Sequence, residues 1–315
     1  MTNKNILIIG GYGFIGSALV EKYYKENNIT IIDNSDYSTS SLGLRNIDIS
    51  KINIHHGDAT DKDFILSIGD NFDYIVNAAA ILGIKKVAEK SIQTIQTNIS
   101  TSNNSLELAK KQKHLLKYLS FSTSEVYGIK TYNSKECDEA VIGPPNEARW
   151  CYAASKILID HLAFAYHREY NIPITIIRPF NIFGEYRLGS NAINTFVSKM
   201  LSNEPVYIDG DGSQVRTWCY IKDFIAGIDS ALTSNYINEI FNIGNPFNKI
   251  TIYELAVLIK SLIGSKSEII VSHSSVPDVK FRTVDIKKAT DKLNYIPNYS
   301  LYEGLANFIE WRKSI

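Results

Sequence analysis

The sequence has few cysteines and no excess of charge of either sign. Cys137, Cys151 and Cys219 are an odd number without metal-ligand spacing, so a reducing cytoplasm fits better than a disulfide scaffold. The 33 basic and 33 acidic side chains give a formal net charge of zero, and no basic block predicts a nucleic-acid or membrane surface. The six histidines are scattered, so we predict no metal site.

Long apolar runs are also missing. No segment is long enough to cross a bilayer, and the first four residues lead directly into an apolar run, so we expect neither a membrane span nor a signal peptide. A chain of 315 residues with 44% hydrophobic side chains suits one large domain and a smaller lobe. We predict a first domain over residues 1–184 and a lobe over 185–315, with some later segments returning to the first domain.

A glycine cluster follows the first apolar run. Residues 6–9 read as a strand, Gly10, Gly13 and Gly16 follow, and a helix-forming stretch continues to residue 26. Gly11 makes a second glycine spacing equally possible. A pyrophosphate can approach backbone amides and a helix N-terminus only where side chains are missing. The pattern therefore predicts a dinucleotide-binding turn, with an ordinary tight turn as the alternative.

Asp33 ends the second apolar run, residues 29–33. A carboxylate in this place can accept hydrogen bonds from the ribose hydroxyls of NAD and would repel the 2′-phosphate of NADP. The sequence therefore favours NAD as the cofactor. A solvated strand-end aspartate is the alternative, and Arg45 downstream could serve as a phosphate partner.

Apolar runs and helical patterns alternate through the first half of the chain. Further strands are expected at 52–56, 72–77, 116–122 and 172–178, and helices at 62–68, 92–113 and 153–169. Short segments at 206–208 and 241–244, with helices at 253–263 and 302–311, suggest a smaller α+β lobe. The predicted fold is α/β, a Rossmann-type doubly wound parallel sheet with a C-terminal α+β substrate lobe.

Tyr152 and Lys156 stand four residues apart in a helical stretch, so both side chains fall on one face. A tyrosine needs its pKa lowered from ~10 by roughly three units to act as a base near neutrality. Burial opposes this change, so nearby cations must provide it, and a lysine ammonium and an oxidised nicotinamide are suitable. Two unrelated surface residues are the alternative.

Thr123, Ser124 and Glu125 directly follow the fifth expected strand. In an open α/β sheet the carboxyl ends of the strands face the ligand. Thr123 or Ser124 could therefore hydrogen-bond a hydroxyl that is being oxidised, and Glu125 could act as acid, base or polar anchor. A capped turn is the alternative.

Together these motifs resemble the extended short-chain dehydrogenase/reductase family of NAD-dependent nucleotide-sugar epimerases, dehydratases and decarboxylases. The resemblance covers nearly the whole chain. It rests on the glycine turn, the run of residues 123–128, Tyr152 with Lys156, and residues 178–184, together with Gly57-Asp58, the polar pattern of residues 212–223, residues 241–244 and Arg282.

The resemblance implies a role for individual residues. Cofactor contacts would come from the glycine turn with Phe14 and Ile15, from Asp33, Asp58 and Ala59, and from Ala78, Ala79 and Ala80. Lys156 would hold the nicotinamide ribose, while Asn181, Arg216 and Arg282 would contact the diphosphate of a nucleotide-sugar substrate. It also implies a homodimer through helices near 98–113 and 149–169, although an apolar helix face can equally pack within one subunit.

The shared first reaction of this family would be oxidation of the sugar at C4, with Tyr152 as base. Dehydratases carry an aspartate where this chain has Ser124, so 4,6-dehydration is the less expected outcome. The run Thr123-Ser124-Glu125 and the residues 143–152 look more like UDP-glucuronate decarboxylases. A 4-epimerase and a C4 dehydrogenase that releases the keto-sugar remain alternatives, and a non-enzymatic NAD-binding sensor is a further one.

Overall fold

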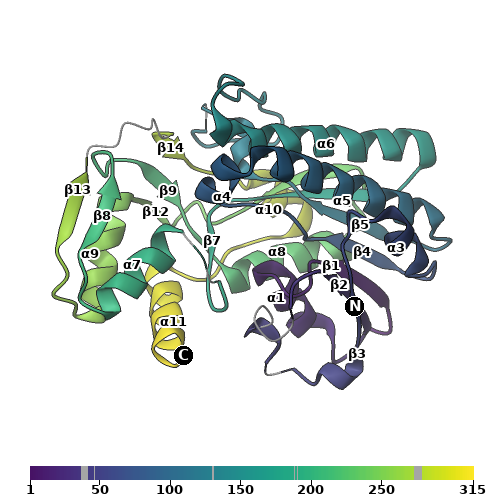
Figure 1. The fold of residues 1–315 in the computed structure, drawn as a ribbon, viewed down its shortest axis with the longest axis horizontal. Helices are drawn as coiled ribbons and strands as arrows, with labels where there is room; N and C mark the ends of the chain where they lie inside the picture. Colours follow the sequence, from purple (N-terminus) through teal and green to yellow (C-terminus); the bar gives the residue numbers. More distant parts are fainter. Residues whose placement is uncertain (37–41, 46, 130, 188, 190, 273–278) are drawn as a thin grey trace.

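The computed structural model describes residues 1–36, 42–45, 47–129, 131–187, 189, 191–272 and 279–315, and its centre is a seven-stranded sheet (Figure 1). All neighbouring strands run parallel, in the order β11-β6-β5-β4-β1-β2-β3. Their bounds are β1 Asn5–Ile9, β2 Asn28–Asp33, β3 Ile52–His56, β4 Tyr74–Asn77, β5 Lys117–Phe121, β6 Ile174–Pro179 and β11 Glu239–Ile243.

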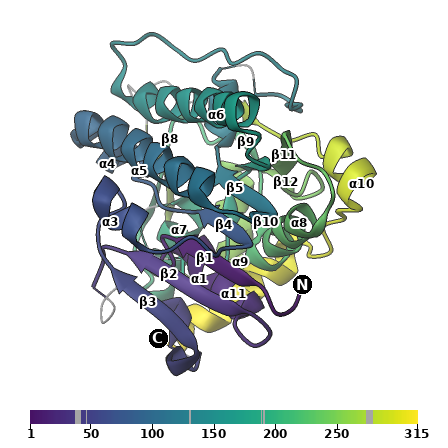
Figure 2. The same ribbon diagram turned by 90° about the vertical axis from the view of Figure 1, so that its right-hand side faces the viewer.

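Helices cover both faces of this sheet (Figure 2). On one side lie α3 Lys62–Ser67, α4 Ile84–Glu89, α5 Ser91–Lys111 and α6 Cys151–Tyr170; on the other lie α1 Phe14–Tyr23 and α8 Ile221–Thr233, with α10 Lys287–Leu293 against α8. The alternation of strand side chains explains the two layers, because Leu7 and Ile9 join one apolar cluster and Ile6 and Ile8 the other.

The smaller lobe follows β6 and is built from short elements. Its helices are α7 Ala192–Leu201, α9 Ile252–Ile263 and α11 Leu301–Lys313. Its strands are β7 Ile182–Phe183, β8 Val206–Asp209, β9 Val215–Thr217, β10 Cys219–Tyr220, β12 Lys249–Thr251, β13 Ile269–Ser272 and β14 Phe281–Arg282. Capping boxes at Thr251 and Ser300 fix the starts of α9 and α11.

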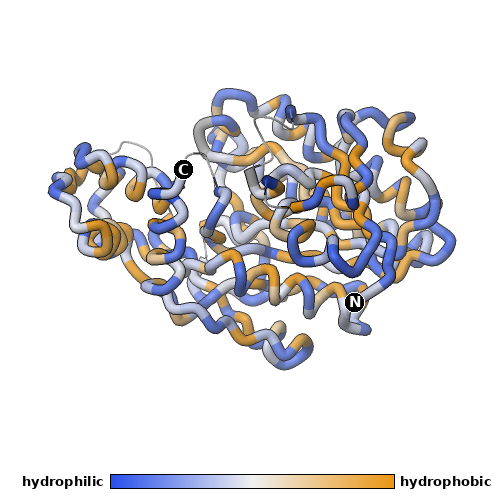
Figure 3. Tube along the Cα trace, turned by 90° about the horizontal axis from the view of Figure 1, so that it is seen from below, coloured by the Kyte–Doolittle hydropathy of each residue, from blue (hydrophilic) through white to orange (hydrophobic). Residues whose placement is uncertain are grey.

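The predicted fold class is confirmed, and the chain passes more than once between the two parts. After building β7 and α7 it returns to the large sheet through α8 and β11. In Figure 3 hydrophobic and hydrophilic positions alternate along much of the trace, and many outer segments are hydrophilic. None of the helices within the described residues is both long and apolar enough to cross a membrane.

Candidate functional site

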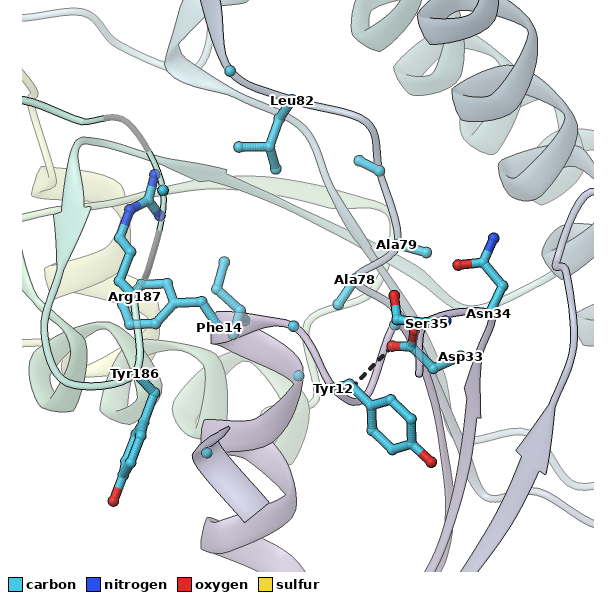
Figure 4. A pocket seen from close by; sticks show the side chains of 18 of the residues that line it. Tyr12, Phe14, Asp33, Asn34, Ser35, Ala78, Ala79, Leu82, Tyr186 and Arg187 are labelled. Atoms are coloured by element: carbon cyan, nitrogen blue, oxygen red, sulfur yellow. Dashed lines mark hydrogen bonds between the residues drawn. The ribbon is translucent and has the colours of Figure 1, made fainter. Parts of the chain in front are cut away.

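A cavity of about 660 Å³ opens at the carboxyl ends of β1, β2 and β4 (Figure 4). Parallel strands bring the residues that follow them to one edge of the sheet, which is where open α/β sheets bind ligands. The lining residues include the glycine turn, Asp33 and Ala78 with its two successors. The full set is Gly10, Tyr12, Gly13, Phe14, Ile15, Gly16, Asp33, Asn34, Ser35, Gly43, Ala78, Ala79, Ala80, Leu82, Gly83, Lys86, Tyr186, Arg187, Gly189 and Asn191.

The glycine turn leaves the start of α1 open to a ligand. Gly10 has a φ of +84°, and a Cβ on it would lie 2.8 Å from the Ala79 nitrogen. A Cβ on Gly16 would lie 2.1 Å from the Gly10 oxygen. Gly13 precedes α1, and no side chain among the described residues caps the helix there. Exposed amides, a helix N-terminus and missing side chains fit the pyrophosphate of NAD.

Asp33 is held by two backbone amides at the cavity wall. Its Oδ2 accepts from the Tyr12 nitrogen at 3.0 Å, which is the dashed line of Figure 4, and its Oδ1 accepts from the Ser35 nitrogen at 2.9 Å. A carboxylate oxygen has further lone pairs, so the group can also accept from ribose hydroxyls. The carboxylate is therefore oriented before any cofactor binds.

Replacing Asp33 with alanine is expected to weaken NAD binding about tenfold, or about 1.4 kcal/mol, because hydrogen bonds to a charged acceptor are lost. NADP binding is expected to strengthen, since the repulsion of its 2′-phosphate disappears. Titration of both cofactors by protein fluorescence gives the ratio of the two affinities. An unchanged ratio would show that Asp33 does not select the cofactor.

Asp58 and Ala59 lie next to the cavity without lining it. Asp58 accepts from the Thr60 nitrogen at 2.8 Å and from Asn34 Nδ2 at 3.3 Å, and mainly the backbone bond lowers the pKa of its carboxyl group. Asn34, which the sequence reasoning did not include, stands between Asp58 and the cavity. The Ala59 oxygen accepts from Asn104 Nδ2 at 3.1 Å, which ties this loop to α5.

Tyr152 and Lys156 lie in the first half of α6, at the carboxyl end of β5. Lys156 is buried, and its Nζ donates to the Phe121 oxygen at 2.7 Å. The same nitrogen lies 6.0 Å from the centroid of the Tyr152 ring. Burial lowers the pKa of Lys156 to about 8, although the Asp160 carboxylate opposes the change. The predicted pair is thus brought together on one helix face.

The pKa of Tyr152 is raised in the protein alone, whereas the sequence argument required it to be lowered. Burial is the main cause and the Glu125 carboxylate adds to it, while a hydrogen bond with Thr123 and the charge of Arg187 act in the other direction. The phenol is therefore neutral before a cofactor binds. NAD in its oxidised form would bring a positive ring and would accept the hydride.

Residues 123–125 form the start of a short 3₁₀ turn, η3 Ser124–Tyr127, directly after β5. Thr123 caps this turn, because its Oγ1 accepts from the Glu125 nitrogen at 3.2 Å. Ser124 is buried, and Glu125 is partly exposed. Glu125 Oε1 lies 3.9 Å from Arg282 Nη1, so the end of β5 and strand β14 meet at this carboxylate.

Asn181, Arg216 and Arg282 come together in the smaller lobe. Arg216 and Arg282 are paired residues of β9 and β14, and Asn181 Nδ2 donates to the oxygen of Thr217 at 2.8 Å. Arg216 is buried, and its Nη1 donates to the Val215 oxygen at 2.9 Å. Two arginines at paired strand positions suit an anion such as a diphosphate.

Arg187 is a site residue that the sequence reasoning missed. It lies at the cavity beside Phe14, with its guanidinium 5.2 Å from the ring centroid (Figure 4). Its charge also acts on Tyr152, as noted above. Its position three residues after Gly184, beyond a strand end, is the signal that could have indicated it. Arg187 therefore links the cofactor cavity to the tyrosine on α6.

Comparisons with known proteins agree with this geometry. Residues 6–244 match the NAD dependent epimerase/dehydratase family. The chain is 34% identical to a UDP-N-acetyl-alpha-D-glucosaminuronate decarboxylase of Bacillus cytotoxicus, over 99% of this chain and 98% of that protein. It is 31% identical to UDP-glucuronic acid decarboxylase 6 of Arabidopsis thaliana, over 96% and 87% of the two chains.

A solved structure shows the same similarity. The crystal structure of a UDP-glucuronic acid 4-epimerase from Bacillus cereus, in complex with UDP-glucuronic acid and NAD, is 28% identical and superposes with a TM-score of 0.90 over 98% of this chain and 99% of that one.

The fold and the site define an NAD-dependent enzyme with a Rossmann-type cofactor domain. The chain belongs to the NAD dependent epimerase/dehydratase family. The comparisons confirm the predicted family resemblance, enzyme class and cofactor, and they confirm the prediction of an oxidoreductase for nucleotide-diphosphate sugars. Within the described residues, no group of three or more histidine, cysteine or acidic side chains is arranged to hold a metal ion.

Proposed function

We propose that this enzyme oxidises C4 of a nucleotide-diphosphate sugar acid with NAD and then removes its carboxylate as carbon dioxide. The observation that carries the proposal is the meeting of Tyr152 and Lys156 with Thr123 and the Glu125–Arg282 pair at the end of β5. A base for the hydroxyl and a carboxylate that can exchange a proton thus lie at one place. The similarity to two sugar-acid decarboxylases supports the choice of substrate class.

The first step needs a base at the C4 hydroxyl. Tyr152 takes the hydroxyl proton, Lys156 stabilises the phenolate, and Thr123 orients it through the hydrogen bond between the two side chains. The glycine turn, Asp33 and residues 78–80 would hold NAD, which would supply hydride transfer from C4 and back. Lys156 would also hold the nicotinamide ribose.

The second step follows from the C4 ketone. A carboxylate on C5 is then β to a carbonyl, so the bond between C5 and the carboxyl carbon breaks and its electron pair moves toward the C4 oxygen. Carbon dioxide leaves, and a proton must be delivered to C5 before the hydride returns to C4. The net change replaces the carboxylate by hydrogen, with NAD unchanged overall. Glu125 lies in this region of the site, where its charge acts on Tyr152.

Ser124 argues against loss of water as the main outcome. A serine hydroxyl is a poor acid for a departing hydroxyl group. The run 123–125 has no aspartate that could take this role in its place. A second candidate is 4-epimerisation of the same substrate, which the similarity to the Bacillus cereus epimerase favours. Both candidates share the C4 oxidation by Tyr152.

Mass spectrometry of the products decides between these reactions. We expect UDP-glucuronate or UDP-N-acetylglucosaminuronate to lose the mass of carbon dioxide without net NADH formation. An unchanged mass with inverted C4 indicates the epimerase, loss of water indicates a dehydratase, and stoichiometric NADH indicates a released keto-sugar. Turnover of neutral UDP-glucose alone would contradict the sugar-acid proposal.

The diphosphate of the substrate would be held by Asn181, Arg216 and Arg282. Support comes from the pairing of Arg216 with Arg282 across two strands, which concentrates positive charge in the smaller lobe. We assign the smaller lobe, mainly residues 185–315, to the substrate and residues 1–184 mainly to the cofactor. Ala78, Ala79 and Ala80 line the cofactor cavity between them.

We further propose a homodimer that works in the cytoplasm. Leu158 and Tyr170 on α6 and Ile92 on α5 are exposed apolar side chains on neighbouring helices, which suits a helix-to-helix interface. Free Cys137, Cys151 and Cys219 suit a reducing compartment. Light scattering of the purified chain would show twice the mass of 35.4 kDa for a dimer, and Leu158→Glu would lower it.

A further inference from the structure

Buried polar side chains lie next to the Tyr152–Lys156 pair and have no role in the function proposed above. Asp160 follows Lys156 by about one turn of α6, and both side chains are buried. The two side chains bind adjacent residues at the end of β5. Lys156 Nζ donates to the Phe121 oxygen at 2.7 Å, and Asp160 Oδ2 accepts from Ser122 Oγ at 2.9 Å. The helix is thus docked on the strand end by this lysine and this carboxylate.

Arg178 of β6 fixes the carboxylate from the other side. Its Nη2 lies 3.0 Å from Asp160 Oδ2, and both side chains are at most one tenth exposed. Arg178 Nη1 also donates to the Tyr127 hydroxyl at 3.0 Å, and that hydroxyl donates to Asn242 Oδ1 at 2.7 Å. The position of Asp160 is therefore set by elements that meet only in the folded protein: β6, η3 and β11.

A buried ammonium group needs a compensating charge, because burial disfavours the charged form. Tyr152 on the same helix, Arg178 on β6, Glu125 on η3 and Arg187 beyond β7 are the other ionisable groups around the pair. Tyrosine is neutral, the arginines repel and Glu125 pairs with Arg282, whereas the charge of Asp160 raises the pKa of Lys156. Asp160 Oδ1 has no hydrogen-bond partner among the described residues, so this oxygen is not occupied by another donor there.

We propose that Asp160, fixed by Arg178, is a positioning residue that keeps Lys156 charged beside Tyr152. The inference rests on the proposed function, in which the Lys156 ammonium stabilises the phenolate. It adds a requirement that the Tyr152–Lys156 pattern alone does not contain. A lysine at this depth without the carboxylate would lose its proton within the working pH range.

The first test measures stability and needs no substrate. Unfolded lysine keeps its proton up to a pKa of ~10.4, whereas Lys156 in the folded protein loses it near pH 8. The unfolded state binds more protons above that pH, so stability rises with pH. In Asp160→Asn the folded pKa falls further, so the rise begins at lower pH, by about one unit. Urea unfolding between about pH 6 and 10 measures the shift.

Two comparisons make this result specific. In a Lys156→Met background, Asp160→Asn is expected to leave the pH dependence of stability above neutrality unchanged. The buried Lys117 also has a pKa near 8, but it is present in all variants and cancels in the difference. Asp223→Asn is the matched control, because Asp223 is a buried carboxylate that accepts from the Asn298 and Tyr299 nitrogens. Asp223→Asn should lower the free energy of unfolding without changing the pH at which this free energy begins to rise.

The second test uses turnover. Asp160→Asn should lower kcat by about tenfold to a hundredfold with little change in KM, and the alkaline fall of kcat should move to lower pH in parallel with the stability curve. Adding Arg178→Met to the Asp160→Asn variant should recover part of the lost stability, because no unpaired buried guanidinium remains. It should not restore the pH profile of kcat.

The outcomes separate the two proposals. An alkaline stability curve that is the same in Asp160→Asn and wild type overturns the inference, and so does a shift that persists in the Lys156→Met background. Failure of the wild-type enzyme to convert any nucleotide-sugar acid overturns the proposed function instead, and the stability comparison still decides the role of Asp160.

Discussion

Replacing Tyr152 with phenylalanine is expected to lower kcat for sugar oxidation by about a thousandfold, which corresponds to about 4 kcal/mol in the activation free energy. Phenylalanine keeps the ring and removes the oxygen that takes the proton of the C4 hydroxyl. NAD affinity should stay close to the wild-type value, because Tyr152 is not among the residues that line the cofactor cavity. The absorbance of NADH in a single turnover measures the rate of sugar oxidation, and a cofactor titration measures the NAD affinity.

The same helix offers a matched control. Tyr166 also lies on α6, and its hydroxyl donates to Glu107 Oε1 at 2.6 Å, on the side that faces α5. Tyr166→Phe removes one tyrosine hydroxyl from the helix and should leave kcat within about twofold of the wild-type rate, since it touches no site residue. A Tyr152→Phe enzyme with normal turnover would exclude the tyrosine as the base.

The pH dependence of the reaction rate follows from the surroundings of Tyr152. Burial and the Glu125 carboxylate raise the pKa of Tyr152, so the rate should increase with pH as the phenol loses its proton. Arg187→Met removes the positive charge that acts in the other direction and should move this rise to higher pH. A positive nicotinamide beside the ring would move the rise to lower pH.

The sheet and the cofactor turn could be predicted from local sequence. Strand β1 is apolar after Asn5 and all five residues of β5 are buried, as expected for parallel strands covered on both faces. The strands β9, β12 and β14 have two or three residues, too few for any periodicity, and they exist only because they pair with one another. The expected helix over 92–113 is observed as α5, with ends shifted by one to two residues.

The site was predictable only where its residues are close in sequence. Tyr152 and Lys156 share one helix face, so their spacing indicated the pair. Arg187 and Arg178 enter from segments that reach the site through the fold, and no local pattern indicates that contact. The sequence gives no measure of burial, so the direction of the Tyr152 pKa shift in the protein alone was not predicted either.

Replacing Gly16 with alanine is expected both to weaken NAD binding strongly and to destabilise the fold. The new Cβ would lie 2.1 Å from the Gly10 oxygen and 2.9 Å from the Gly11 Cα. These are backbone atoms of the turn that holds the pyrophosphate, so the turn must open to make room. We expect a loss of about a hundredfold or more in NAD affinity, about 2.7 kcal/mol, and a loss of about 1–3 kcal/mol in stability from overpacking.

Gly13→Ala separates binding from folding in the same turn. Gly13 has a φ of −66° and a ψ of 167°, which any residue adopts, and a Cβ there would lie 3.3 Å from the Gly10 oxygen. Stability should therefore change by less than about 1 kcal/mol. Gly13 also lines the cavity at the start of α1, so the added methyl group should still weaken NAD binding. Urea unfolding and calorimetric titration of both variants test the pair. Normal NAD binding by both would place the cofactor elsewhere, whereas loss of binding in both with loss of stability only in Gly16→Ala identifies this turn as the pyrophosphate site.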